Sequence, residues 1–340
     1  MTSSGVAGGA DLEVRPASAS RGRLLAVGRT ILRKLLDIVI VVFVAATFVF
    51  LMLQLMPGDP EDVLLKGIFE ITPAVREEVV RDYGLDRPVW EQYIHFLTGI
   101  AQGDLGRSYQ IRQPVAEIIA ANLGPTAALA AAALGVAIVL AVVLATVSAG
   151  RGPIASLVTQ AFELIAISVP SFWIGLLLLT AFSFTIPIFP SSGARGLESL
   201  VLPAITLAIP VTGILAQILR ERMDEALEQP FVTTVRTRGA GEVRVRVLHV
   251  LRHALLPALT FSGAVLGSLL IGTAVIETLF SRPGVGRVLL TAVISNDMPL
   301  VMGIIVFGSV VFVVVNSIVD VLAAVIDPRL RAESGVRRSW

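Results

Sequence analysis

The chain has 340 residues, of which 55% are hydrophobic and 16% are charged, and its formal net charge is +1. Soluble domains carry nearer a quarter of charged residues, so this composition indicates an integral membrane protein and excludes an ordinary soluble domain. Cysteine is absent, which excludes disulfides, thiol catalysis and cysteine-based metal sites.

In chain order, a polar tail over residues 1–30 comes first, and its Gly, Ser and Arg content predicts disorder. The first membrane helix follows over 31–57, and we interpret it as retained because it is too long for the core of a signal peptide. A bilayer requires roughly 20 apolar residues per helix. Six stretches meet this requirement: 35–56, 122–149, 154–180, 200–219, 254–276 and 300–322.

The distribution of charge predicts the orientation of these six helices. Arginine and lysine gather before the first span, over 220–252 and in the tail 327–340, whereas segment 58–117 is net acidic. The positive-inside rule therefore places both termini in the cytoplasm and segment 58–117 outside. Within this outer segment, "TPAVREEVVRDYGL" predicts a short helix between Pro73 and Gly84, and we expect Ser108 to be accessible from outside.

The basic segment between the fourth and fifth spans predicts two helices joined by a sharp turn. Pro230 suits the first turn of a helix, Gly239 suits its left-handed end, and Glu242 suits the start of the next helix. The second helix has an expected apolar stripe. Its members are Val243, Val247, Val250, Leu251 and Ala254. The alternation in "EVRVRV" is also typical of a strand, which we disfavour because a strand edge leading into lipid would be unpaired. The first helix could dock on a partner or rest on lipid headgroups.

A family resemblance is carried by this segment and by four others. "FVTTVRTRGA" followed by "RHALLP" resembles the "EAA" loop of ABC importer permeases of the dipeptide, oligopeptide and nickel branch. Thr233, Thr234 and Val235 occupy the three positions that name the loop, and His253 replaces the usual Asn. The other stretches similar to this family are "FLMLQLMPGDP", "YGLDRPVWEQYIHFLTGIAQGDLGRSY", "VIETLFSRPGVGRVLLTAVISNDMPLV" and "NSIVDVLAAVIDPRLR".

The resemblance implies an all-α fold, the type I ABC importer transmembrane fold, with six spans and a cytoplasmic coupling helix. It implies a transmembrane domain over 118–326 with a coupling loop over 223–252. The residues that it assigns to ATPase coupling are Phe231, Val232, Thr233, Thr234, Val235, Arg236, Arg238, Gly239 and Ala240. The implied partners are a second permease subunit, expected to be a different chain, two ABC ATPase subunits and an extracytoplasmic substrate-binding protein. The implied location is the bacterial inner membrane, with no role for nucleic acid.

Signatures of catalysis are missing from the sequence. It contains no G-x-x-x-x-G-K-[ST], no H-E-x-x-H and no G-x-S-x-G. We therefore expect no catalytic, cofactor or metal residues in this chain, with ATP and Mg bound by partner subunits. His249 and His253 have a spacing that permits metal binding on a helix, but two ligands are too few for a closed site.

A few polar and small residues inside the predicted spans leave alternatives open. Glu163 is the one acid of the third span, so it is either functional or leans back to the interface. Gly263 and Gly267 permit close helix contact, within the chain or between subunits. Pro170, Pro203 and Pro210 are expected to bend the third and fourth spans.

The predicted cargo is di- or oligopeptides, with a nickel chelate or glutathione as alternatives within the same architecture. A stand-alone secondary transporter is disfavoured, because the spans lack the midplane charges and the internal repeat that such a protein needs.

Overall fold

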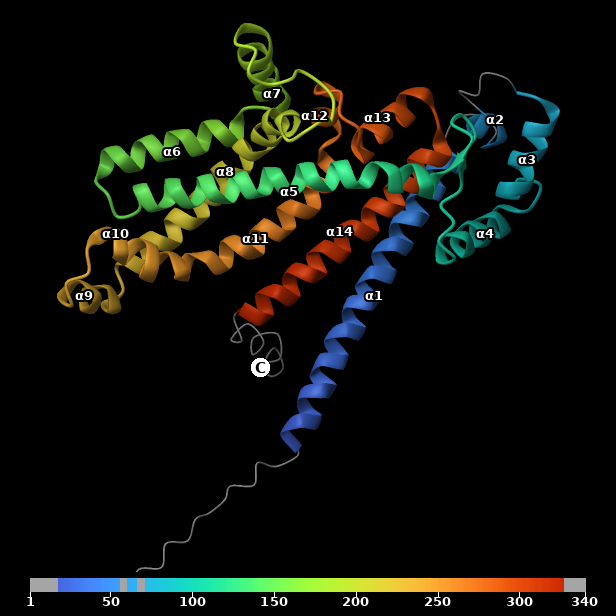
Figure 1. The fold of residues 1–340 in the computed structure, drawn as a ribbon. Coiled ribbons are helices and arrows are strands. Elements are labelled where there is room, and N and C mark those ends of the chain that lie inside the picture. The colour runs from blue at the N-terminus through green and yellow to red at the C-terminus, as the bar shows by residue number, and fades with distance from the viewer. Residues whose placement is uncertain (1–17, 56–59, 66–70, 327–340) are drawn as a thin grey trace, which may run out of the picture.

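The computed structural model describes residues 18–55, 60–65 and 71–326, and these residues are almost entirely helical (Figure 1). The first half contains α1 (Ser18–Leu55), α2 (Pro60–Leu65), α3 (Pro73–Tyr83), α4 (Val89–Ala101), α5 (Val115–Ser148), α6 (Pro153–Ser168), α7 (Ser171–Leu179) and the π-helical η1 (Thr180–Thr185). The second half contains α8 (Glu198–Leu227), α9 (Pro230–Thr237), α10 (Glu242–Arg244), the π-helical η2 (Val245–Val250), α11 (Leu251–Gly272), α12 (Ala274–Leu279), α13 (Val285–Ser295) and α14 (Met298–Ile326). One antiparallel ladder pairs β1 (Arg107–Ser108) with β2 (Gln113–Pro114).

Among the described residues, four helices are long and apolar enough to cross a membrane by themselves, and two bent pairs raise the number to six. The four are Leu32–Leu55 of α1, α5, α8 and Met298–Val319 of α14. The bent pairs are Pro153–Ser168 with Ser171–Thr185, and Glu242–Leu255 with Pro257–Leu270. The predicted all-α membrane fold is confirmed, and a count of six spans holds if each bent pair is one span.

The third predicted span, 154–180, is wrong as a continuous helix. The structure ends α6 at Ser168 and starts α7 at Ser171, with an angle of 98° between the two halves. Pro170 lies at the break, and the residue before it, Val169, is extended with φ −81° and ψ 126°. A residue that precedes proline is disfavoured in the helical region, which explains why the helix stops here. The bend expected at Pro170 is therefore much sharper than a kink.

The core of the bundle is the contact between α5 and α8, which run side by side with α11 packed on them (Figure 1). On α5, a row of alanines four residues apart is completely buried: Ala133, Ala137, Ala141 and Ala145. Side chains as small as alanine let two helix backbones approach closely, which is how helices associate where lipid removes most of the hydrophobic drive.

Helices α11 and α14 pack against each other at Gly263 and Gly267, the two glycines for which the sequence predicts close helix contact. A Cβ atom added to Gly263 would overlap the side chain of Val319, and one added to Gly267 would lie 3.2 Å from the ring of Phe312. Both glycines therefore lie against α14 of the same chain. α14 in turn packs on α1 (Figure 1).

Two features of the N-terminal third differ from the prediction. Helix α1 begins at Ser18, inside the range 1–30 for which the sequence predicts a disordered tail, because the Ala, Leu and Arg residues of this stretch favour helix. Residues 1–17, like the tail 327–340, lie outside the described part of the chain. The expectation that Ser108 is accessible is wrong, because its side chain is fully buried and donates a hydrogen bond to Asp297.

Candidate coupling site

The segment that the sequence assigns to coupling forms the helix, turn and helix that its residues predict. α9 begins at Pro230, Gly239 takes the left-handed conformation with φ +83°, and α10 begins at Glu242. No atom lies within 4 Å of a Cβ added to Gly239, so its backbone conformation alone requires glycine. The strand interpretation of "EVRVRV" is wrong, since these residues continue from α10 into η2.

An ion pair closes the turn between the two helices. The guanidinium of Arg236 donates from Nε to Oε1 of Glu242 at 2.8 Å and from Nη2 to Oε2 at 3.2 Å. The hydrogen bonds from Arg236 lower the pKa of the Glu242 carboxyl below its ordinary value. Both side chains are about half exposed, so the pair orders the turn more than it stabilises the fold.

Helix α9 is attached to the protein by one face and leaves the opposite face open. Val232 is buried, and the ring of Phe231 lies 5.0 Å from that of His253. Val235 and Ala240 are half-buried beside them. The exposed members of the predicted set are Thr233, Thr234, Arg236, Arg238 and Gly239. The open face is therefore polar and basic, a surface suited to a protein partner.

The apolar stripe predicted for the second helix is wrong at its beginning. Val243 and Val247 are 72% and 42% exposed, whereas Val245 and Val250 are completely buried. The π-helical turn η2 has i→i+5 hydrogen bonds and more residues per turn than an α-helix, so the α-helical spacing assumed for the stripe does not apply there. Val250, Leu251 and Ala254 are buried as predicted.

Behind the coupling segment, a buried charge pair joins α6 to α8. Arg220 donates from Nε to Oε1 of Glu163 at 3.1 Å and from Nη2 to Oε2 at 2.9 Å. One helical turn later, Asp224 accepts a hydrogen bond from the backbone N–H of Gly150 at 2.7 Å, in the turn between α5 and α6. Glu163 is thus paired inside the protein and does not reach the interface. The charge pattern counts Arg220 among the cytoplasmic arginines of 220–252, one residue beyond the predicted end of the fourth span, and does not predict its pairing with Glu163.

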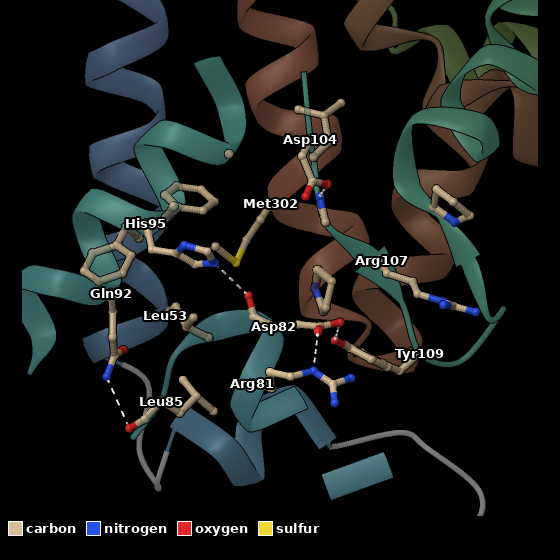
Figure 2. Close-up of a pocket in the computed structure, with 17 residues that line it drawn as sticks. Leu53, Arg81, Asp82, Leu85, Gln92, His95, Asp104, Arg107, Tyr109 and Met302 are labelled. Carbon is tan, nitrogen blue, oxygen red and sulfur yellow. Dashed lines mark hydrogen bonds and ion pairs between the residues drawn. The ribbon is translucent and has the colours of Figure 1, made fainter. Parts of the chain in front are cut away.

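The opposite end of the molecule has a pocket of about 460 Å³ that the sequence did not predict (Figure 2). The hydroxyl of Tyr109 donates to Oδ2 of Asp82 at 2.9 Å, and Nε2 of His95 lies 3.2 Å from the Asp82 carbonyl oxygen. Figure 2 shows Arg81 on α3, below Asp82, and Arg107 on β1, to the right of Asp82, and both line the pocket. In the part of the chain that the structure describes, no group of three or more His, Asp or Glu residues could hold a metal ion.

Comparison with known proteins gives matches along nearly the whole chain. Residues 137–332 match the model of the binding-protein-dependent transport system inner membrane component, and residues 27–130 match that of its N-terminal part. A Brucella abortus (strain 2308) protein provisionally named a peptide transport system permease protein is 36% identical over 310 residues, covering 88% of this chain and 98% of the relative. The glutathione transport system permease protein of Escherichia coli (strain K12) is 33% identical over 304 residues, with the same coverage. The crystal structure of an amino acid ABC transporter aligns with 66% of this chain and 95% of that one, at a TM-score of 0.41 and 15% identity.

Proposed function

The chain belongs to the family of binding-protein-dependent transport system inner membrane components, and we propose that it forms half of the pathway through which an ATP-driven importer takes up di- or oligopeptides. As a member of the dipeptide and oligopeptide branch of ABC importer permeases, it is a multi-pass membrane protein. It is a transport permease and not itself an enzyme. ATPase and substrate-binding proteins are the general partners of this family.

For this chain we propose a specific assembly. The second half of the pathway comes from a different permease chain, and two ATPase subunits bind ATP and Mg. A substrate-binding protein delivers the cargo from outside. The protein lies in a bacterial inner membrane with both termini in the cytoplasm. The arginines around α9 support a cytoplasmic position for that end of the bundle, which leaves α3 and α4 at the extracytoplasmic end.

The observation that carries the coupling role is the arrangement of α9. One face of this short helix is fixed by Val232 and Phe231, and its opposite face presents Thr233 and Thr234 to solvent at the end of the bundle. A groove in an ATPase subunit would receive that face and would move the helix when the ATPase dimer closes.

The coupling role is tested by enlarging the exposed face without touching the buried one. Thr234→Arg should abolish binding of the ATPase subunits to the permease pair, because an added guanidinium obstructs the groove. The matched control is Thr291→Arg, at another exposed threonine on α13, which should leave binding unchanged. Normal ATPase binding by the Thr234 variant would show that α9 is not the docking element.

Peptide cargo is supported by the Brucella relative, and the Escherichia coli relative favours glutathione as a second candidate. Glutathione is itself a short peptide, so one pathway suits both. Uptake of radiolabelled dipeptide and of glutathione by the complete importer, each competed with the other, distinguishes them. Uptake of neither compound would contradict both assignments.

A further inference from the structure

Helix α4 has an exposed apolar face although it is too short to cross a membrane. It has 13 residues, and Val89, Trp90 and Ile94 are 54%, 62% and 51% exposed. Its other face carries the buried Gln92 and the half-buried Phe96. A large exposed indole beside two aliphatic side chains is unfavourable in water, so this face needs a covering medium.

The contacts of α4 with α1 fix its depth relative to the membrane. The hydroxyl of Tyr93 lies 2.6 Å from Oγ1 of Thr47, and its ring lies 5.2 Å from that of Phe50. Gln54 donates to Gln92 at 3.3 Å. The apolar span of α1 continues to Leu55. Thr47 lies eight residues before that end, about 12 Å along the helix axis.

Helix α4 therefore lies beside the last two turns of a membrane span and not beyond them. The flank of α1 at this level is itself apolar and exposed, with Phe48, Leu51 and Leu55 at 57%, 49% and 73%. These side chains belong to a helix that crosses the bilayer, so lipid is the medium that surrounds them. The exposed face of α4 continues this lipid-covered surface.

We propose that α4 is an interfacial membrane helix, whose Trp90 and Ile94 lie in the lipid at the boundary between headgroups and acyl chains. Tryptophan is enriched at this boundary because its ring is apolar and its N–H is polar. A short amphipathic helix lying in the membrane plane has the same construction. In this position α4 anchors the segment that carries the pocket of Figure 2 at the outer boundary of the bilayer.

The absence of cysteine makes a clean depth measurement possible. Single cysteines at Ile94 and, as a matched exposed control on α3, at Glu77 are spin-labelled in the full chain, assembled with its partner subunits in a bilayer. The label at 94 should collide more often with oxygen, which dissolves in hydrocarbon, than with a water-soluble nickel complex. The label at 77 should show the reverse order.

A second measurement needs no change on α4. The chain has three tryptophans, so Trp173→Phe with Trp340→Phe leaves Trp90 as its only tryptophan, in an assembly whose partner subunits carry phenylalanine in place of tryptophan. Lipids brominated on the acyl chain should quench its fluorescence, and aqueous iodide should not. Quenching by iodide would place α4 in water and overturn the proposal. Trp90 could also be protected from both quenchers in the complete assembly and lose that protection when the second permease is omitted. That result would make α4 part of a subunit interface and would also overturn the proposal.

Discussion

Separation of Arg220 from Glu163 tests whether the charge pair between α6 and α8 is buried as the structure shows. The side chains are 10% and 5% exposed, and two hydrogen bonds of 3.1 and 2.9 Å join them. We consider three variants: Arg220→Met, Glu163→Leu and the double replacement. Both replacements are apolar and preserve most of the side-chain volume, so they remove charge with little loss of packing.

The two single variants should be much less stable than the double variant. Arg220→Met leaves a buried carboxylate without a partner, which typically costs about 3–5 kcal/mol. Glu163→Leu leaves the guanidinium of Arg220 with Asp224 alone, at 3.9 Å and 42% exposed, so its penalty should be smaller but still clearly destabilising. Asp224 still keeps its hydrogen bond to Gly150 in each variant. Because well-packed apolar residues can replace a buried pair at little or no cost, the double variant should lie near the unchanged protein.

The assay is a double-mutant cycle on the free energy of unfolding, measured by reversible titration of the purified chain with a denaturing detergent. The matched control is the pair Arg222 and Glu225 on the same helix, which is joined at 2.9 Å but is 52% and 64% exposed. An exposed pair at this spacing is worth about 0.3–0.5 kcal/mol. If the coupling between Arg220 and Glu163 were no larger than that of the control, the pair would be exposed to water and the reasoning would fail.

Three further predictions concern the coupling segment and the orientation of the chain. Gly239→Val should abolish transport while preserving membrane insertion, because a β-branched residue is strongly disfavoured at a φ of +83°. The control Gly241→Val, at a φ of −69°, should retain transport activity, and equal uptake by the two variants would contradict the coupling role of the turn. Gln102→Cys, on an exposed residue, should react with an impermeant thiol reagent in intact cells, whereas Thr237→Cys should react only after lysis; labelling of the latter from outside would reverse the topology. The pKa of the Glu242 carboxyl is lowered by its arginine partner, so the turn should keep its full stabilisation above the pKa of the unfolded chain and lose it as the pH falls through the lowered value. Carboxyl chemical shifts followed by NMR during an acid titration measure this, and an unshifted or raised pKa would refute it.

The parts of the fold that the sequence predicted are those set by neighbouring residues. α3 begins at Pro73, where Thr72 accepts a hydrogen bond from the N–H of Val75 at 3.3 Å, and it ends before Gly84 with φ +60°. Each of these capping interactions joins residues within about one helical turn, so a short stretch of sequence contains both partners of each. The turn at Gly239 was predicted for the same reason.

The parts that it missed depend on residues far apart in the chain. Glu163 and Arg220 are 57 positions apart, and nothing near Glu163 identifies its partner. Ser108 is buried and donates its hydroxyl hydrogen bond to Asp297, 189 residues later in the chain. Hydropathy measures the amount of apolar sequence and not its direction, so it joined α6 and α7 into one span across a bend of 98°.

The placement of these missed contacts suggests how a displacement of α9 would enter the membrane domain. α9 follows directly from α8, and two side chains in the last turns of α8 hold neighbouring elements: Arg220 holds α6 through Glu163, and Asp224 holds the turn between α5 and α6 through Gly150. A helix bound by hydrogen bonds at two successive turns cannot slide past its neighbours unless those bonds break. Since separating the buried pair costs several kcal/mol, movement of α8 with α6 and the α5–α6 turn as one body requires less free energy than movement of α8 alone. A force on α9 would therefore displace three elements of the membrane domain together.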